Sequence, residues 1–177
     1  ISFETGKRIV EMVHEDLTPS KIMTKEAFEN AIYVASAIGA SSNCPPHLTA
    51  IARHMGIDLS IDSWEKLGHD IPLLVNCQPA GEYLMEGFFK AGGIPAIMQE
   101  LMKNNKLHKN VMTVTGKTVE ENLKIKINID ESVIKSFKNP LVENAGFIVM
   151  KSNFFSSAVM KTSVISEEFR KRYLSNP

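Results

Sequence analysis

The stretch TKEAFENAIYVASAIGASSNCPPHLTAIARH, residues 24–54, contains two helix patterns that meet at Gly39. In its first part, apolar side chains recur at the spacing of one helix face: Phe28, Ala31, Ile32, Ala35 and Ile38. Thr24 supplies the oxygen of an N-cap, Glu26 puts a negative charge in the first turn, and Gly39 suits a C-terminal cap. This part predicts a helix that buries one apolar face and ends at Gly39.

The second part predicts a helix that begins at a pair of prolines. Pro45 and Pro46 are tolerated at a helix start, because the N–H groups they lack would have no helical partner there. Its expected buried stripe consists of Leu48, Ile51, Ala52 and Met55.

Three short polar residues, Ser41, Ser42 and Asn43, precede this second helix. The amino end of a helix carries partial positive charge and unpaired N–H groups, which stabilise a carboxylate or a phosphate. The same residue types also serve as ordinary N-caps. The residues alone therefore leave an anion-binding role and a capping role as alternatives.

Outward from this stretch, the pattern predicts further short helices separated by turn residues. One covers residues 7–14 and ends before Pro19, and another begins at Ser60 or Asp62. Two more helices are expected within residues 78–105, one on each side of the pair Gly92–Gly93, and the second of them begins near Pro95. A last helix, capped by Thr118, is expected at residues 118–123.

Strands are predicted in four places. IPLLVN (71–76) is short and apolar, a short strand is expected before the turn at Gly116, and KIKINID (124–130) alternates polar and apolar residues. The sequence from Asn139 onward is β-rich. The predicted fold class is α/β, with residues 1–123 in a helix-rich domain, 124–140 as a linker and 141–177 at the start of a β-rich domain.

Composition excludes several classes of partner. The 177 residues are 44% hydrophobic and 23% charged, with 20 basic and 20 acidic residues, so no net field attracts nucleic acid or a membrane surface. No apolar run approaches the roughly 18 to 20 residues that span a bilayer. The opening ISFETGKRIVEMV lacks an initiator Met and is already helical in pattern, which suggests a segment of a longer protein.

The cysteines and histidines raise two questions, whether they bind a metal and whether Cys44 is the nucleophile of a thiol enzyme. Cys44 and Cys77 lie far apart without a C-x-x-C motif, which argues against a disulfide framework and a zinc site and favours a reduced compartment, the cytoplasm or alternatively the mitochondrion. A helix start would lower the thiol pKa of Cys44 and could make it the nucleophile of a thiol enzyme with His47 as its base. The favoured alternative is a small buried hydrophobe, because this Cys-to-His spacing is not a recurring protease signature. His47 and His54 are about 10 Å apart along a helix, too far to share one metal ion.

Four stretches in series resemble the dihydroxy-acid dehydratase and 6-phosphogluconate dehydratase family. They are TGKRIVEMVHEDLTPSKIMTKEAFENAI (5–32), IGASSNCPPHLTAIARHMGIDL (38–59), LVNCQPAGEYLMEGFFKAGGIPAIMQELM (74–102) and MTVTGKTVEENL (112–123). Their order and spacing are those of the central portion of the family. The sequence from residue 140 to 177 is similar to the branch that acts on sugar acids such as arabinonate and xylonate, whereas branched-chain amino-acid enzymes carry a different turn there.

The resemblance implies a hydro-lyase that converts a 2,3-dihydroxy sugar acid of the pentonate type into a 2-keto-3-deoxy acid. Loss of hydroxide needs a Lewis acid on the C3 oxygen, a cation on the carboxylate and a base at C2. In the family these are an iron–sulfur cluster, Mg²⁺ and a serine. Their positions are expected before Ile1 and after Pro177, so no catalytic residue and no metal ligand is assigned, and neither Cys44 nor Cys77 matches a cluster ligand.

The family segment GGSTNA maps onto residues 39–44 and implies that Ser41, Ser42 and Asn43 bind substrate. Ala40 replaces a glycine; if that position has a positive φ, alanine costs about 1 kcal/mol. The family also implies a swivelling β-barrel-like carboxy-terminal domain and a homo-oligomer with a small-molecule sugar-acid substrate, and this segment alone is expected to be inactive. The alternatives are a dihydroxy-acid dehydratase of branched-chain amino-acid synthesis and a truncated, non-catalytic binding remnant.

Overall fold

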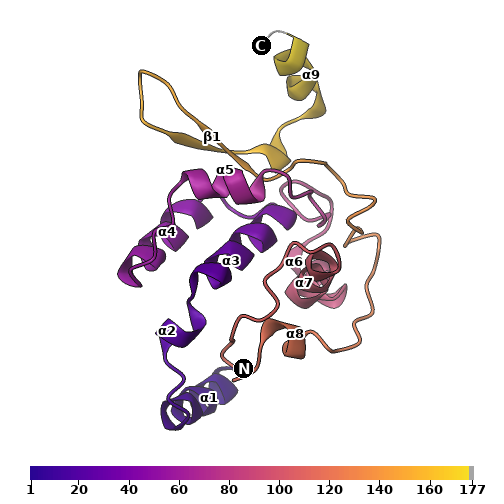
Figure 1. The fold of residues 1–177 in the computed structure, drawn as a ribbon. Helices are drawn as coiled ribbons and strands as arrows, with labels where there is room; N and C mark the ends of the chain where they lie inside the picture. Colours follow the sequence, from indigo (N-terminus) through magenta and orange to yellow (C-terminus); the bar gives the residue numbers. More distant parts are fainter. Residues whose placement is uncertain (176–177) are drawn as a thin grey trace.

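The computed structural model describes residues 1–175, which form a helix-rich α/β structure with one small antiparallel sheet (Figure 1). In chain order the elements are α1 (Ser2–His14), α2 (Pro19–Ile22), α3 (Lys25–Ala37), α4 (Cys44–His54), α5 (Asp62–Gly68), α6 (Met85–Lys90), α7 (Gly93–Lys103), α8 (Val119–Asn122), β1 (Phe147–Met150), β2 (Ala158–Lys161), the 3₁₀ helix η1 (Thr162–Val164) and α9 (Glu167–Ser175). No helix among these residues is both long and apolar enough to cross a bilayer.

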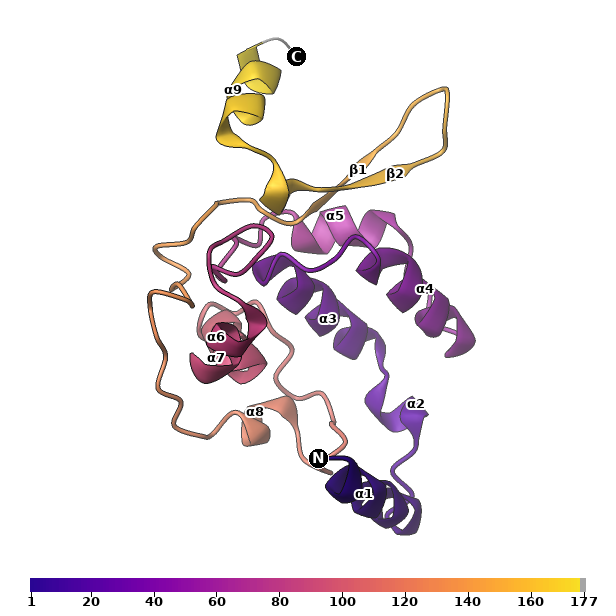
Figure 2. The same cartoon turned by 180° about the vertical axis from the view of Figure 1, so that it is seen from behind.

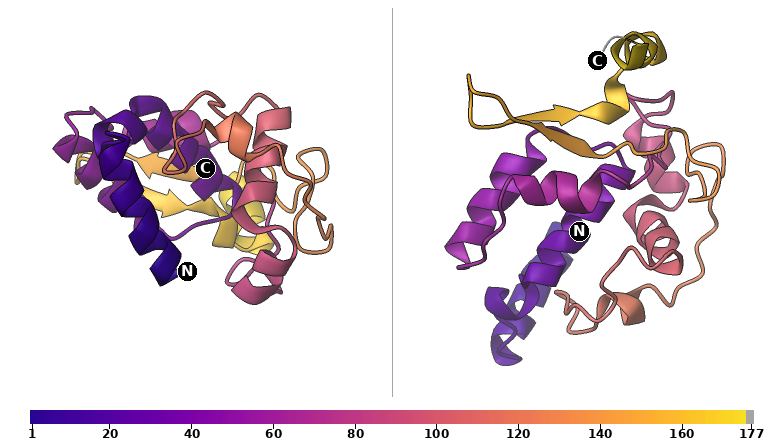
Figure 3. Two further views of the ribbon diagram at one scale, coloured as in Figure 1. Left: turned by 90° about the horizontal axis from the view of Figure 1, so that it is seen from below. Right: turned by 45° about the horizontal axis from the view of Figure 1, so that its top comes forward.

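Helix α3 is the centre of the arrangement, with α4 and α5 on one side and α6 and α7 on the other (Figure 2). The hairpin of β1 and β2 lies across α5 (Figure 3), and α1 lies at the opposite end of the molecule. The predicted features of α3 are confirmed: Thr24 Oγ1 accepts the Ala27 N–H at 3.3 Å, and Gly39 follows the helix with φ of 61°. Its buried face includes Phe28, Ile32 and Ala35.

Two apolar clusters fill the interior on either side of α3. One brings α3, α4 and α5 together with the hairpin, and at its centre Trp64 meets Phe147 edge to face, with ring centroids 5.2 Å apart. The other surrounds the buried segment 71–76 and includes Leu74, Ile97 and Leu101. The hairpin is thus attached to the helices through an aromatic contact.

The predicted strand at 71–76 is extended and buried but forms only isolated bridges, at Leu73 and Val75. Its backbone bonds go to the end of α3 and to two irregular segments instead of one neighbouring strand. Leu73 N–H donates to Val142 O at 2.8 Å, Leu74 N–H to Ala37 O at 2.8 Å, and Asn76 N–H to Val133 O at 2.8 Å. Because its partners change at almost every residue, no regular ladder forms.

Two other predicted strands are also wrong. The segment 124–130 forms no strand, because Gln99 Nε2 donates to the carbonyls of Leu123 and Ile125, both at 2.8 Å, in place of a neighbouring strand. The strand expected before Gly116 is a single bridge between Met112 and Thr118.

The predictions for the other helices are mostly confirmed. Thr118 Oγ1 accepts the Glu121 N–H at 3.2 Å while Glu121 Oε2 accepts the Thr118 N–H at 2.8 Å, a complete capping box. The Thr118 N–H and the Thr118 hydroxyl both donate to Glu121 Oε2 and hold the pKa of the Glu121 carboxyl below its usual range. In the predicted stripe of α4, Ala52 is fully buried but Ile51 is 43% exposed, so the buried face is narrower than expected.

Asn30 connects α3 to the loop that follows α7. Its side chain is buried, accepts the His108 N–H at 2.7 Å and donates to the His108 carbonyl at 2.9 Å. We expect Asn30→Ala to lower the free energy of unfolding by about 2 to 3 kcal/mol, because both backbone groups lose their partner. Denaturant unfolding measures this, with exposed Asn110→Ala as the control; equal values for the two variants would contradict it.

Candidate functional site

A hollow of about 480 Å³ lies where four segments meet: the loop after α3, the turn after the buried segment 71–76, the start of α6, and the end of β2 with η1. Its lining includes polar side chains from three of these segments, and the remaining wall is largely apolar. Among the lining residues are Ser41, Ser42, Gln78, Phe88 and Lys161.

Of the three predicted site residues, the structure places Ser41 and Ser42 in this lining and Asn43 just outside it. All three are exposed. Ser41 Oγ accepts the Asn43 N–H at 3.2 Å, and the Ser41 carbonyl accepts the Cys44 N–H at 3.0 Å. Asn43 occupies the N-cap position of α4, but its side chain makes no capping hydrogen bond. The capping alternative is therefore not supported for Asn43.

Ala40 is accommodated without backbone strain. Its φ is not positive, and its N–H donates to the Ala35 carbonyl at 2.8 Å. The left-handed position is Gly39 instead, whose Cα faces Leu73 and Ser163. The cost expected for an alanine with positive φ consequently does not arise at position 40.

The opposite wall is a tight turn that was not predicted from the sequence. Asn76 O accepts the Tyr83 N–H at 3.1 Å, and Asn76 Oδ1 accepts the Glu82 N–H at 2.9 Å, which closes the turn at its base. Gly81 is required there, since a Cβ would overlap Asn76. The Gln78–Pro79 bond within the turn is cis. In the sequence, Pro79 and Gly81 shortly after the apolar run 71–76 were the signal that could have predicted this turn.

Lys161 is the only charged residue in the described lining of the hollow. It ends β2 opposite Phe147 and is partly buried, and burial lowers the pKa of its ammonium group while the nearby Cys44 opposes that shift. Within residues 1–175, no carboxylate forms an ion pair with it. The sequence did not predict its role; a lysine after the apolar run Ala158–Met160 was the signal.

For Cys44 the structure supports the buried-residue alternative over a reactive thiol. Burial raises the pKa of the Cys44 thiol, an effect larger than the opposing influence of Lys161 and of the hydrogen bond at Ser41. His47, the candidate base, is exposed, and its side chain makes no hydrogen bond among those described. Cys77 is buried with its Sγ 3.8 Å from Met85 Sδ. In the described part of the chain, no three His, Cys, Asp or Glu side chains are grouped to hold a metal.

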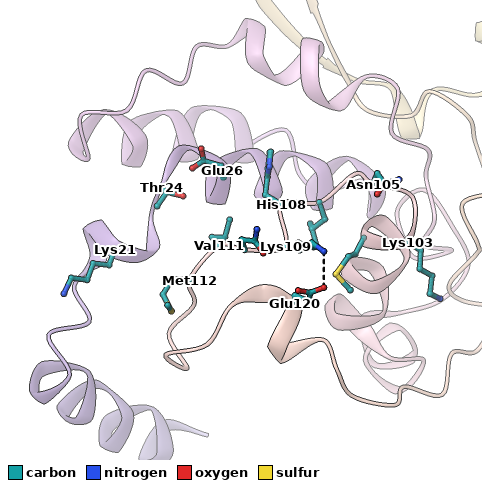
Figure 4. A pocket seen from close by; sticks show the side chains of 13 residues that line it. Lys21, Thr24, Glu26, Lys103, Asn105, His108, Lys109, Val111, Met112 and Glu120 are labelled. Carbon is teal, nitrogen blue, oxygen red and sulfur yellow. Dashed lines mark hydrogen bonds and ion pairs between the residues drawn. The ribbon is translucent and has the colours of Figure 1, made fainter.

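A second and larger hollow, of about 810 Å³, lies between α3, the end of α7 and α8 (Figure 4). Each lysine that lines it already has a carboxylate partner, and Glu26 adds a further negative charge. Lys109 Nζ lies 3.3 Å from Glu120 Oε1, and His108 Nε2 lies 2.6 Å from Glu29 Oε2. Because the opposite charges within each pair compensate one another, we expect this hollow to attract an anionic ligand less strongly than the hollow that contains Lys161.

Comparison with known proteins covers the whole chain. The family model described as dihydroxy-acid/6-phosphogluconate dehydratase N-terminal matches residues 1–122. D-xylonate dehydratase of Caulobacter vibrioides is 51% identical over 177 residues, which are 100% of this chain and 30% of that protein. L-arabinonate dehydratase of Rhizobium leguminosarum bv. trifolii is 48% identical over 163 residues, 92% of this chain and 28% of the relative.

A relative with a different name is also similar. Dihydroxy-acid dehydratase of Ignicoccus hospitalis is 40% identical over 168 residues, 94% of this chain and 30% of that protein. The chain spans at most 30% of the length of each of these relatives. The segment shared with all three includes the loop of Ser41 and Ser42.

Proposed function

This chain belongs to the dihydroxy-acid/6-phosphogluconate dehydratase family, and from that premise we propose that it is part of a hydro-lyase that dehydrates a sugar acid of the pentonate type. The product would be a 2-keto-3-deoxy acid. It forms when the proton on C2 and the hydroxyl group on C3 are lost as water and the resulting enol tautomerises. The similarity to a xylonate and an arabinonate dehydratase supports this substrate class.

The observation that carries the proposal is the polar content of the smaller hollow. The loop that resembles the family segment GGSTNA presents Ser41 and Ser42 to it, and the turn opposite adds Gln78. Hydroxyl and amide groups both donate and accept hydrogen bonds, as a polyhydroxylated substrate requires. Asn43, at the rim beside Ser42, is proposed to contact the same substrate.

The complete enzyme is proposed to contain an iron–sulfur cluster and Mg²⁺. The described residues do not fit either group, because they offer no cluster of metal-binding side chains and the thiol of Cys44 has a raised pKa. We therefore assign the ligands and the base to other parts of a longer polypeptide. In this chain, the proposed role of Ser41, Ser42 and Asn43 is to bind and orient the substrate.

The domain organisation is part of the proposal. Residues 1–123 would complete the helix-rich amino-terminal domain, 124–140 would connect it, and 141–177 would begin a β-rich carboxy-terminal domain of the swivelling barrel type. The β1–β2 hairpin supports this division. The full protein is proposed to be a homo-oligomer, and the 177 residues alone are expected to be inactive.

A dihydroxy-acid dehydratase of branched-chain amino-acid synthesis is the second candidate. The apolar wall of the hollow, which includes Val75, Met85 and Phe88, can accommodate an alkyl chain, and one similar relative carries that name. The test compares D-xylonate, L-arabinonate and 2,3-dihydroxy-3-methylbutanoate with the full-length protein that contains this sequence. Faster turnover of a pentonate supports the first candidate, and faster turnover of the branched acid would replace it with the second.

Asn43→Ala tests the proposed substrate contact. Because the Asn43 side chain is exposed and makes no capping bond, its removal should change the free energy of unfolding by less than about 0.5 kcal/mol. We expect kcat/KM for the pentonate to fall about tenfold or more, the cost of one lost substrate hydrogen bond. Steady-state kinetics with exposed Asn139→Ala as the control measures this, and unchanged kinetics would remove Asn43 from the site.

A further inference from the structure

We propose that Lys161 binds the carboxylate of the polyhydroxy acid in the smaller hollow and so selects anionic over neutral substrates. This inference rests on the proposed function and adds to it a specific residue for the charged end of the substrate. Three features of the structure support it: the charge of the hollow, the rigidity of the chain around Lys161, and the groups that face it.

The charge of the hollow is unbalanced. A partly buried ammonium group normally has a carboxylate partner, because desolvation of an unpaired charge is costly. Even some exposed lysines of the described chain have such partners: Lys90 Nζ lies 2.6 Å from Glu86, and Lys151 Nζ lies 2.8 Å from Asp62, whereas half-buried Lys135, like Lys161, forms no ion pair among the described residues. Lys161 has none within residues 1–175, and no Asp or Glu is among the described residues that line the hollow. A bound anion would supply the missing charge.

The backbone that carries Lys161 is fixed on both sides. Lys161 pairs with Phe147 across the hairpin, and Phe147 is buried against Trp64. The next residue, Thr162, is buried and donates from Oγ1 to the Gly146 carbonyl at 2.6 Å. Ser163 is also buried, beside Gly39 at the start of the Ser41–Ser42 loop. The lysine and the serines are consequently held in one rigid neighbourhood, which favours recognition of a single ligand.

The chemistry of the lining identifies the class of ligand. One ammonium group compensates one negative charge, which suits a monocarboxylate better than a diphosphate. Ser41, Ser42 and Gln78 supply hydrogen bonds for the hydroxyl groups of the same molecule. A carboxylate accepts hydrogen bonds at both of its oxygens, so Lys161 needs to donate to only one of them. The hollow therefore matches a small hydroxylated monocarboxylate.

The experiment uses the full-length protein and two unreactive probes that differ only at C1: a 3-deoxypentonate with its carboxylate, and the corresponding neutral 3-deoxypentitol with a hydroxymethyl group in that place. We expect Lys161→Met to raise the inhibition constant of the 3-deoxypentonate at least tenfold and to leave that of the 3-deoxypentitol within twofold. KM for D-xylonate should rise more than kcat falls, and Lys161→Arg should restore part of the affinity. Lys151→Met, on the exposed part of the hairpin, is the matched control and should match wild type.

The outcomes separate this inference from the proposed function. Suppose that wild type dehydrates pentonates, but that Lys161→Met raises the inhibition constants of both probes equally or leaves both unchanged. The assignment of Lys161 is then wrong, and the proposed function stands. If wild type dehydrates no sugar acid, the proposed function fails. Calorimetric titration of the same two probes into wild type and Lys161→Met then decides whether Lys161 recognises a carboxylate, and equal dissociation constants in the two proteins would overturn it.

Discussion

Gly146→Ala is expected to lower the free energy of unfolding by about 3 kcal/mol or more, because the added methyl group would occupy the space of backbone atoms. A Cβ at position 146 would overlap the carbonyl group of Gly68 at the end of α5 and the amide of His69. Backbone cannot move aside as a flexible side chain can. The hairpin would have to shift away from α5, which would also loosen the contact between Trp64 and Phe147.

Two other glycines provide controls for this measurement by denaturant unfolding. Gly56 has a φ of 69° but open space around it, so Gly56→Ala should cost only about 1 kcal/mol from backbone strain. Gly6 lies within α1, also in open space, so Gly6→Ala should stabilise the protein by about 0.5 to 1 kcal/mol. A Gly146→Ala cost no larger than that of Gly56→Ala would show that α5 and the hairpin are not in close contact.

The helices could be predicted from sequence because their determinants are local. The Thr24 cap, the apolar spacing from Phe28 onward and the terminal Gly39 act within one or two turns of α3. The segments 71–76 and 124–130 could not be assigned correctly for the opposite reason. A period-two or apolar run specifies an extended backbone, but whether a ladder forms depends on partners elsewhere in the chain. Here those partners are irregular segments and the Gln99 side chain.

The candidate site was predictable only in part, because some of its residues are neighbours in the sequence and others are brought together only by the fold. Ser41 and Ser42 were found because they lie in one contiguous family-like segment. Lys161 and Gln78 complete the hollow from positions far away in sequence, and only the packing of the hairpin and the turn brings them to the serines. Conversely, the reactive-thiol alternative for Cys44 rested on the local helix start alone. The structure buries the thiol in part, and the desolvation raises its pKa by more than Lys161 and the hydrogen bond at Ser41 lower it.

Gly39→Ala is expected to lower kcat/KM for a pentonate about 100-fold, a larger loss than the one expected for Asn43→Ala. The φ of Gly39 is 61°, and a Cβ would lie 2.9 Å from Leu73 Cδ1 and 3.0 Å from Ser163 Oγ. Relief of both the strain and the crowding requires a shift of the loop that carries Ser41. A displacement of about 1 Å between substrate-binding groups is enough for a loss of this size.

Gly56→Ala is the matched control for this second change, because Gly56 also follows a helix with a positive φ but a Cβ added there would meet nothing within 4 Å. Both variants carry similar backbone strain. Only the Cβ added at Gly39 would press against Ser163, which lies two residues beyond Lys161. Only Gly39→Ala is therefore expected to displace the serines relative to Lys161. Steady-state kinetics on the full-length protein should therefore show near-normal turnover for Gly56→Ala and a large loss for Gly39→Ala. Equal activities in the two variants would mean that the position of the Ser41–Ser42 loop does not matter to the reaction, and would remove the hollow from the substrate site.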